Sequence, residues 1–138
     1  MTVAGRFQYV TCMKISLDVP GAIHVVRAYV PGELRIGDRR FDRSLIVTAT
    51  TLIEHWRPGT IDELVPGDLD PLLELRPEVL LIGSGNRQRF PDRRALAALY
   101  SARLGFEVMD TGAACRTYNL LVAEGRHVAA ALIVERAD

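Results

Sequence analysis

The sequence is poor in the residues that build metal sites and disulfide frameworks. It has two cysteines, Cys12 and Cys115, and three histidines far apart within apolar stretches, His24, His55 and His127. Structural zinc typically takes four clustered ligands, and two distant cysteines do not make a disulfide framework. We therefore expect no metal site, no cofactor and no disulfide framework.

An excess of charge of either sign is also absent. The chain has 17 basic and 17 acidic residues, and all the basic residues except Lys14 are arginine. We interpret the arginine bias as coding bias from a G+C-rich genome. The alternative is selection for the guanidinium fork that binds carboxylates and phosphates. Proteins that bind phosphate backbones usually carry a clear basic excess, so we expect no general nucleic-acid binding.

Long apolar runs are missing as well. The N-terminus has no charged head followed by an apolar stretch of signal-peptide length, and the late apolar run 128–134 is short. A membrane-spanning helix needs about 20 apolar residues. We therefore expect a cytoplasmic protein with no membrane insertion.

The 138 residues contain 49% apolar and 25% charged side chains, without an internal repeat or a linker. This composition predicts one globular domain over residues 1–138, with residues 1–20 as an N-terminal extension. The first half reads as β-rich, with a strand at 22–30, a hairpin turning at Gly37-Asp38 and a buried strand at 44–50.

The second half alternates strands with helices. Expected strands are 78–83, 106–110 and 127–135, and expected helices are 68–77, 91–105 and 111–125. Within 91–105, helical spacing predicts one apolar face containing Leu96, Leu99, Tyr100 and Leu104. The sequence thus predicts an α/β fold: a single three-layer domain around a mixed β-sheet, with a β-rich N-terminal half and a Rossmann-like βαβαβ C-terminal half.

Two strand ends carry the candidate site, because ligands of α/β folds favour the crevice beyond the carboxyl ends of the strands. The first is LIGSGN, 81–86. It is not a dinucleotide fingerprint, since the third glycine would fall on Gln88 and the next helix begins too late. We expect its glycines to form a tight turn and Ser84 to be a turn hydroxyl, since no G-x-S-x-G elbow is present.

Four arginines follow this turn, at Arg87, Arg89, Arg93 and Arg94. They form either an anion-binding rim beside the crevice or a solvated loop and first helical turn. Asp92 among them favours the solvated loop.

The second strand end is MDTGAACRTYN, 109–119. Its Asp-Thr-Gly matches the signature of retroviral-type aspartic proteases, but those enzymes bring together two such loops within a β-rich fold. Here the motif opens a helix, so we expect Asp110 or Thr111 to cap that helix.

Cys115 lies about one turn inside the same helix, beside Arg116, and both features favour a thiolate. The alternative is a small core residue that, with Ala113 and Ala114, lets the helix pack closely on the sheet. No base for a cysteine nucleophile is assignable from the sequence. We therefore expect no catalytic set and do not expect an enzyme.

The run Arg116-Thr117-Tyr118-Asn119 places polar residues around a tyrosine that fits the buried face of the helix. Thr and Asn are weak helix formers, and locally unfavourable choices often mark function. Arg116 and Asn119 are one turn apart and can present a joint polar surface. A recognition surface and a lock between helix and sheet remain equally open.

These two stretches resemble a small α/β family of largely uncharacterised proteins. The family includes the third assembly factor of mitochondrial respiratory complex I and an adipogenesis-associated cytosolic protein. The similarity runs from about Ile23 to Val134 and is most specific at 107–126. The family's Ile-Gly-Ser/Thr-Gly falls on 82–85, its Met-Asp/Ser-Thr-x-Ala-Ala-x-Arg-Thr-Tyr-Asn on 109–119 and its tryptophan on Trp56. Many relatives carry proline at the end of the third expected strand, where this chain has Ala49. No functional role is therefore carried over from the family to this strand end.

The resemblance implies a three-layer α/β fold and no established reaction, and its best-understood eukaryotic member helps subunits assemble. We therefore expect a non-enzymatic, assembly-factor-like module that binds a protein partner; the sequence leaves its oligomeric state open. The predicted site residues are Gly83, Ser84, Gly85, Asn86, Asp110, Thr111, Cys115, Arg116, Thr117 and Asn119. The alternative is a small-molecule binder or weak enzyme that holds an anionic ligand in the same crevice near Cys115.

Overall fold

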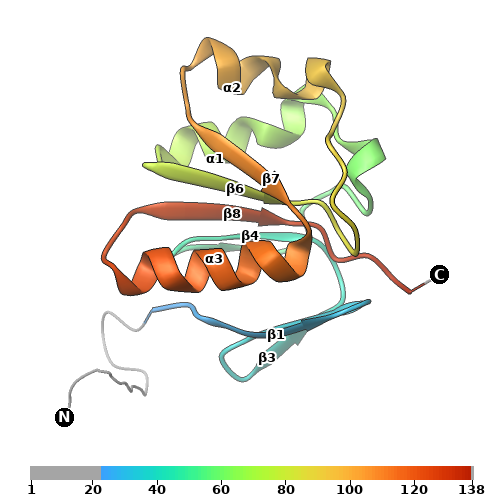
Figure 1. Ribbon diagram of the computed structural model, residues 1–138, viewed down its shortest axis with the longest axis vertical. Coiled ribbons are helices and arrows are strands. Elements are labelled where there is room, and N and C mark those ends of the chain that lie inside the picture. Colours follow the sequence, from blue (N-terminus) through green and yellow to red (C-terminus); the bar gives the residue numbers. More distant parts are fainter. Residues whose placement is uncertain (1–22, 138) are drawn as a thin grey trace.

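The computed structural model describes residues 23–137, so the N-terminal extension expected at 1–20 lies outside the described residues. Over these residues the chain forms two β-sheets and three α-helices, together with short 3-10 turns (Figure 1). No helix within 23–137 is both long enough and apolar enough to cross a lipid bilayer.

The larger sheet has five strands in the order β5-β4-β8-β6-β7. Their bounds are β4 Leu45–Val47, β5 Leu52–Ile53, β6 Val79–Gly83, β7 Phe106–Met109 and β8 Val128–Leu132. β6 pairs in parallel with β7 and β8, whereas β4 pairs antiparallel with β8 and β5. Every residue of the central β8 is buried. A sheet covered on both faces explains why β6 and β8 read as continuous apolar runs.

The smaller sheet is an antiparallel meander of β1 Val26–Val30, β2 Glu33–Ile36 and β3 Arg39–Phe41. Two-residue turns join its strands, and Gly32 and Gly37 in these turns have φ of +85° and +59°. Glycine adopts such values without the steric cost that other residues bear. The hairpin predicted at Gly37-Asp38 is confirmed.

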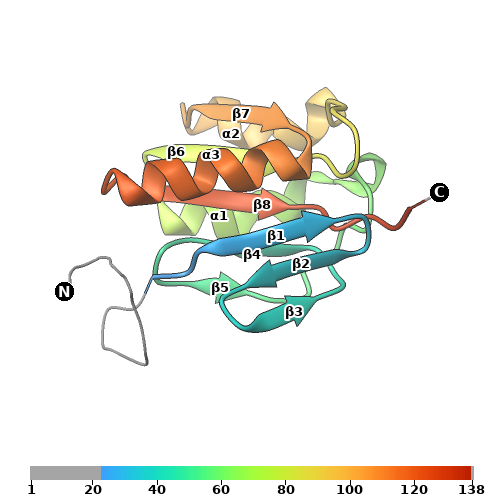
Figure 2. The same ribbon diagram turned by 60° about the horizontal axis from the view of Figure 1, so that its bottom comes forward.

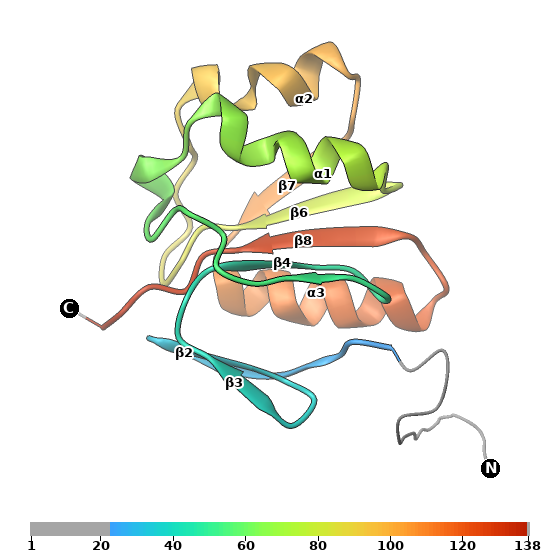
Figure 3. The ribbon, with the colours of Figure 1, turned by 180° about the vertical axis from the view of Figure 1, so that it is seen from behind.

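Helix α3, Thr111–Ala123, and the smaller sheet cover one face of the larger sheet (Figures 1 and 2). The other face is covered by α1 Asp70–Leu75, α2 Ala97–Ser101 and the 3-10 turns Ile61–Glu63, Pro66–Leu69 and Arg93–Leu96 (Figure 3). Strand alternation divides the side chains between the faces. Leu81 packs toward α3, for example, while Leu80 and Ile82 pack toward α1 and α2. The predicted three-layer α/β fold around a mixed sheet is confirmed.

The helix expected at 91–105 is shorter than its spacing suggested. A 3-10 turn at Arg93–Leu96 leads into α2, and Tyr100 is 61% exposed instead of buried. A 3-10 turn has about three residues per turn, so the buried stripe through Leu96 and Leu99 leaves Tyr100 at its margin. The tyrosine ring instead packs against Phe106 in a T-shaped arrangement, with ring centroids 5.5 Å apart.

Candidate functional site

The loop after β6 folds back over the end of its own strand. Ser84 is fully buried, and its hydroxyl donates to the carbonyl of Arg87 at 2.6 Å and accepts the N–H of Arg89 at 3.1 Å. The Ser84 N–H donates to the carbonyl of Met109 at 2.8 Å. The Ser84 hydroxyl therefore stabilises the turn, as expected from the sequence.

Thr111 and Asp110 fix the start of α3 against the strand ends. The Thr111 hydroxyl accepts the N–H of Gly85 at 2.9 Å and donates to the carbonyl of Ile133 at 2.7 Å. Asp110 is the helix cap, because its Oδ1 accepts the N–H of Ala113 at 2.8 Å. The capping role expected for this pair therefore belongs to Asp110, and Thr111 joins three segments of the fold.

Asn86 and Glu135 close the crevice beyond the parallel strands. The Asn86 N–H donates to Glu135 Oε1 at 2.9 Å, and its side-chain amide donates to the Arg136 carbonyl at 3.0 Å. The Tyr29 hydroxyl donates to Asn86 Oδ1 at 2.5 Å. A Cβ on Gly85 would lie 2.5 Å from Glu135 Oε1. The protein's own C-terminal segment thus contacts the turn after β6 at the crevice where the binding site was expected.

The arginines after this turn have acidic neighbours. Arg89 contacts Asp62 at 3.1 Å and Glu135 at 3.4 Å, while Arg94 lies 3.6 Å from Asp92. All three contacts involve exposed arginines, and such pairs contribute little to stability. The solvated-loop interpretation fits Arg89 and Arg94 better than an anion rim.

The polar run on α3 divides into inward and outward residues. Asn119 uses both ends of its amide on the backbone of Val26, accepting its N–H at 3.0 Å and donating to its carbonyl at 2.8 Å. Fully buried Tyr118 donates its hydroxyl to the His24 carbonyl at 2.8 Å, and burial raises its pKa. Thr117 lies 3.5 Å from the sulfur of Met109, whereas Arg116 is exposed.

Cys115 is a buried thiol, 5% exposed. Burial raises its pKa to about 12, against a smaller lowering by Arg116 and a further raising by Asp110. A neutral thiol is a poor nucleophile. The environment thus matches a small core residue rather than a reactive cysteine.

A pocket of about 220 Å³ lies between β1 and α3. We call it the β1–α3 pocket; it is lined by Val26, Arg27, Ala28, Tyr29, Gly112, Cys115, Arg116 and Asn119. The structure therefore brings three predicted site residues together with β1 residues that the sequence analysis did not select. Arg27 lies in a strand that read only as β-branched and apolar, and its proximity to α3 depends on long-range packing.

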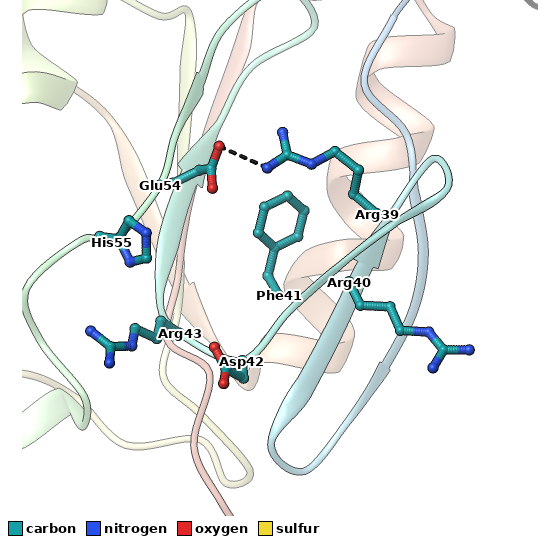
Figure 4. A pocket seen from close by; sticks show the side chains of 7 residues that line it. All are labelled: Arg39, Arg40, Phe41, Asp42, Arg43, Glu54 and His55. Carbon is teal, nitrogen blue, oxygen red and sulfur yellow. Dashed lines mark hydrogen bonds and ion pairs between the residues drawn. The ribbon is translucent and has the colours of Figure 1, made fainter.

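A second pocket, of about 130 Å³, lies where β3 faces the segment after β5 (Figure 4). Arg39 contacts Glu54 there at 2.9 Å, and its guanidinium carbon is 4.8 Å from the Phe41 ring centroid. His55 also lines it and has a φ of +59°, uncommon for a residue other than glycine. Because Asp42 and Glu54 accompany the arginines of this pocket, its positive charge is partly offset.

Comparison with known proteins identifies the family to which the chain is related. Residues 26–133 match the family described as protein of unknown function (DUF498/DUF598). The chain belongs to this family. The match begins at β1 and ends just after β8, so the β1–α3 pocket lies within the DUF498/DUF598 domain. The resemblance seen in the sequence, which ran from about residue 23 to 134, is confirmed.

Curated relatives and a solved structure agree with this membership. The chain is 32% identical over 108 residues to the "13 kDa major membrane protein" of Francisella tularensis subsp. holarctica (strain LVS), covering 78% of this chain and 88% of that one. It is 30% identical over 125 residues to the NADH dehydrogenase (ubiquinone) 1 alpha subcomplex assembly factor 3 of Mus musculus, covering 87% of this chain but 66% of the mouse protein. A solution structure of a Xanthomonas campestris protein superimposes with a TM-score of 0.77 at 36% identity, covering 91% of this chain and 96% of that one.

Proposed function

We propose that this DUF498/DUF598 protein is a non-enzymatic binding module that acts on a protein partner in the manner of an assembly factor. The observation that carries the proposal is its relationship to assembly factor 3 of NADH dehydrogenase, whose name describes assembly of a protein complex. A subunit of a respiratory complex is accordingly the first partner to test.

The surface around the β1–α3 pocket is the docking site in this proposal. On α3, Arg116 and Leu120 are one turn apart and exposed, with Leu120 at 60%. Val25, just before β1, is 40% exposed. A basic residue beside exposed apolar side chains suits a protein interface better than bulk solvent.

The chemistry of Cys115, the nucleophile considered from the sequence, supports a binding role over catalysis. Cys115 is held neutral by burial, with a pKa of about 12, and Asn119 is occupied by the backbone of Val26. Ser84 uses its hydroxyl within the turn. The groups at this surface that face solvent are thus suited to contact rather than to bond cleavage.

The test is a pull-down of the tagged protein from its own host, beside the double variant Arg116→Ala/Leu120→Ala. The matched control is Arg93→Ala/Tyr100→Ala, which removes an exposed arginine and an exposed large side chain from the opposite face. We expect a protein that is retained by the wild type and the control but lost from the α3 variant. Identical partners on all three proteins would reject this docking surface, and no partner on any would reject the binding module.

A second candidate function is binding of a small anionic metabolite, favoured by Arg27 and Arg116 around one pocket. Binding of an anion to the folded state alone raises the melting temperature. Stabilisation by millimolar phosphate or a dicarboxylate, lost in Arg27→Gln/Arg116→Gln, would favour it over a protein partner.

A further inference from the structure

The outer edge of β1 offers backbone groups to the β1–α3 pocket. Val30 and Glu33 flank the two-residue turn between β1 and β2, so they form a hydrogen-bonded pair. Pairs alternate along an antiparallel ladder, which makes Tyr29 and Leu34 the next, non-hydrogen-bonded pair. The N–H and C=O of Tyr29 therefore point away from β2, toward the side of the sheet that faces α3.

At the other end of β1, Asn119 bonds to the outward-pointing backbone groups of the strand. At Val26 its side-chain amide supplies both the acceptor and the donor that a neighbouring strand would supply. Toward the turn, the first residues of α3 contact β1 again, since a Cβ on Gly112 would lie 4.0 Å from the Tyr29 ring. The pocket is the interval between these two contacts, with Arg27 and Ala28 on one wall and Cys115 and Arg116 on the other.

The charged side chains that line the β1–α3 pocket are basic. Arg27 and Arg116 both line it and both are exposed, and none of the acidic side chains within the described residues lines it. Among residues 23–137 neither arginine forms an ion pair. The nearby Asp110 uses its Oδ1 on the helix cap. The second pocket differs, because Glu54 there is paired with Arg39.

We propose that the β1–α3 pocket receives an acidic side chain from an extended segment of the protein partner. Arg27 and Arg116 hold its carboxylate by charge-assisted hydrogen bonds, and the segment's main chain bonds to the outer edge of β1 at Tyr29. The volume of about 220 Å³ suits a single side chain, since pockets for drug-sized ligands usually span about 300–1,000 Å³. This inference rests on the proposed protein-binding function and names the chemistry of the partner.

The experiment is a 1H–15N NMR titration of the full chain with two blocked hexapeptides. One is acetyl-Ser-Val-Glu-Val-Glu-Ser-amide, and the other has glutamine in place of both glutamates. We expect the glutamate peptide to shift the amide signals of 27–29 and 112–116 and to bind at least tenfold more tightly than the glutamine peptide. Arg27→Gln/Arg116→Gln should lose these shifts, whereas Arg93→Gln/Arg94→Gln, with the same change in charge on the opposite face, should keep them.

Equal binding of both peptides, shifts confined to other residues, or full binding by Arg27→Gln/Arg116→Gln would overturn the inference. Inorganic phosphate that reproduces the same shifts at the same affinity would also overturn it, because the pocket would then take free anions. If the peptide fails while the pull-down partner is still lost from Arg116→Ala/Leu120→Ala, the docking function stands and only this inference fails. If both experiments fail, the proposed function fails with it.

Discussion

Asn119 on α3 and Val26 on β1 are joined by two hydrogen bonds, of 3.0 and 2.8 Å, between one side-chain amide and both backbone groups of the strand residue. The amide occupies the place of a missing neighbouring strand, since β1 is an edge strand of its sheet. Together with the bond from Tyr118 to the His24 carbonyl, it fastens the smaller sheet to the helix. Two of the polar side chains on α3 therefore have structural partners.

Asn119→Asp tests this fastening. The carboxylate still accepts the Val26 N–H but has no hydrogen to donate to the Val26 carbonyl, which it would then face with a negative charge. We expect a loss of roughly 1–3 kcal/mol in the free energy of unfolding, measured by urea denaturation. Leu120→Ala, at the exposed neighbouring position, should change this free energy by less than about 0.5 kcal/mol. Unchanged stability of Asn119→Asp would contradict a structural role for the amide.

The layers of the fold were predictable because burial on two faces leaves a strong trace in the sequence. The continuous apolar runs of β6 and β8 require covers on both sides, and α3 carries its own apolar stripe around Tyr118. Tyr100 shows the limit of such reasoning. Spacing alone does not reveal that the segment before α2 is a 3-10 turn, which changes the face on which the tyrosine emerges.

The candidate site was predictable only in part. The polar run on α3 conflicts with helix propensity, which indicated that its residues have partners. The identity of a partner such as Val26, 93 residues away from Asn119, depends on how β1 packs on the helix. Arg27 was missed for the same reason, since nothing in its local sequence relates it to Arg116. The crevice at the strand ends shows a further limit. The sequence assigned residues up to Glu135 to the last strand, whereas β8 ends at Leu132 and Glu135 contacts the turn after β6 at this crevice.

Gly85→Ala tests the closure of that crevice. Gly85 has a φ of +104°, and an added Cβ would lie 2.5 Å from Glu135 Oε1, displacing the carboxylate that accepts the Asn86 N–H. The matched control is Gly37→Ala, where φ is +59° and no neighbouring atom in the part of the chain that the structure describes lies within 4 Å of the added one. We expect about 1–2 kcal/mol of destabilisation in the control from backbone strain alone. Gly85→Ala should cost clearly more in thermal or urea unfolding. Equal losses in both variants would show that Glu135 moves aside freely.

Cys115 should be almost unreactive in the folded protein. A pKa of about 12, against an ordinary value of 9.0, leaves about a thousandth of the usual thiolate at pH 8. In a Cys12→Ser background, iodoacetamide should label Cys115 very slowly in buffer and readily in 8 M urea, as followed by mass spectrometry. The Arg116→Gln variant should not accelerate labelling, because burial rather than this arginine dominates the pKa. Rapid labelling in buffer would restore the cysteine as a candidate for chemistry.

Asp68 should make the stability of the protein depend on pH in the acidic range. Arg57 donates to both of its carboxylate oxygens, at 2.9 and 2.7 Å, and the Val65 N–H donates to it at 2.9 Å. The hydrogen bonds from Arg57 are the main reason that its pKa lies below the ordinary 3.8. Because the folded pKa is depressed, the unfolded chain takes up this proton first as the pH falls. The stabilisation is therefore complete above the unfolded pKa and is lost as the pH falls through the folded one.

Asp68→Asn should remove this dependence. The variant should lose about 1 kcal/mol of unfolding free energy at pH 7 and show a shallower decline between pH 5 and pH 2 than the wild type, measured by urea denaturation at each pH. Glu54→Gln, which removes the carboxylate of the more exposed pair with Arg39, is the control and should have a smaller effect at pH 7. Parallel pH profiles for Asp68→Asn and the wild type would show that the pKa of Asp68 is the same in the folded and unfolded chains. The attachment of the Pro66–Leu69 turn would then depend on other contacts, among them the buried Leu69 side chain and the bond from the Trp56 indole to the Asp68 carbonyl at 2.8 Å.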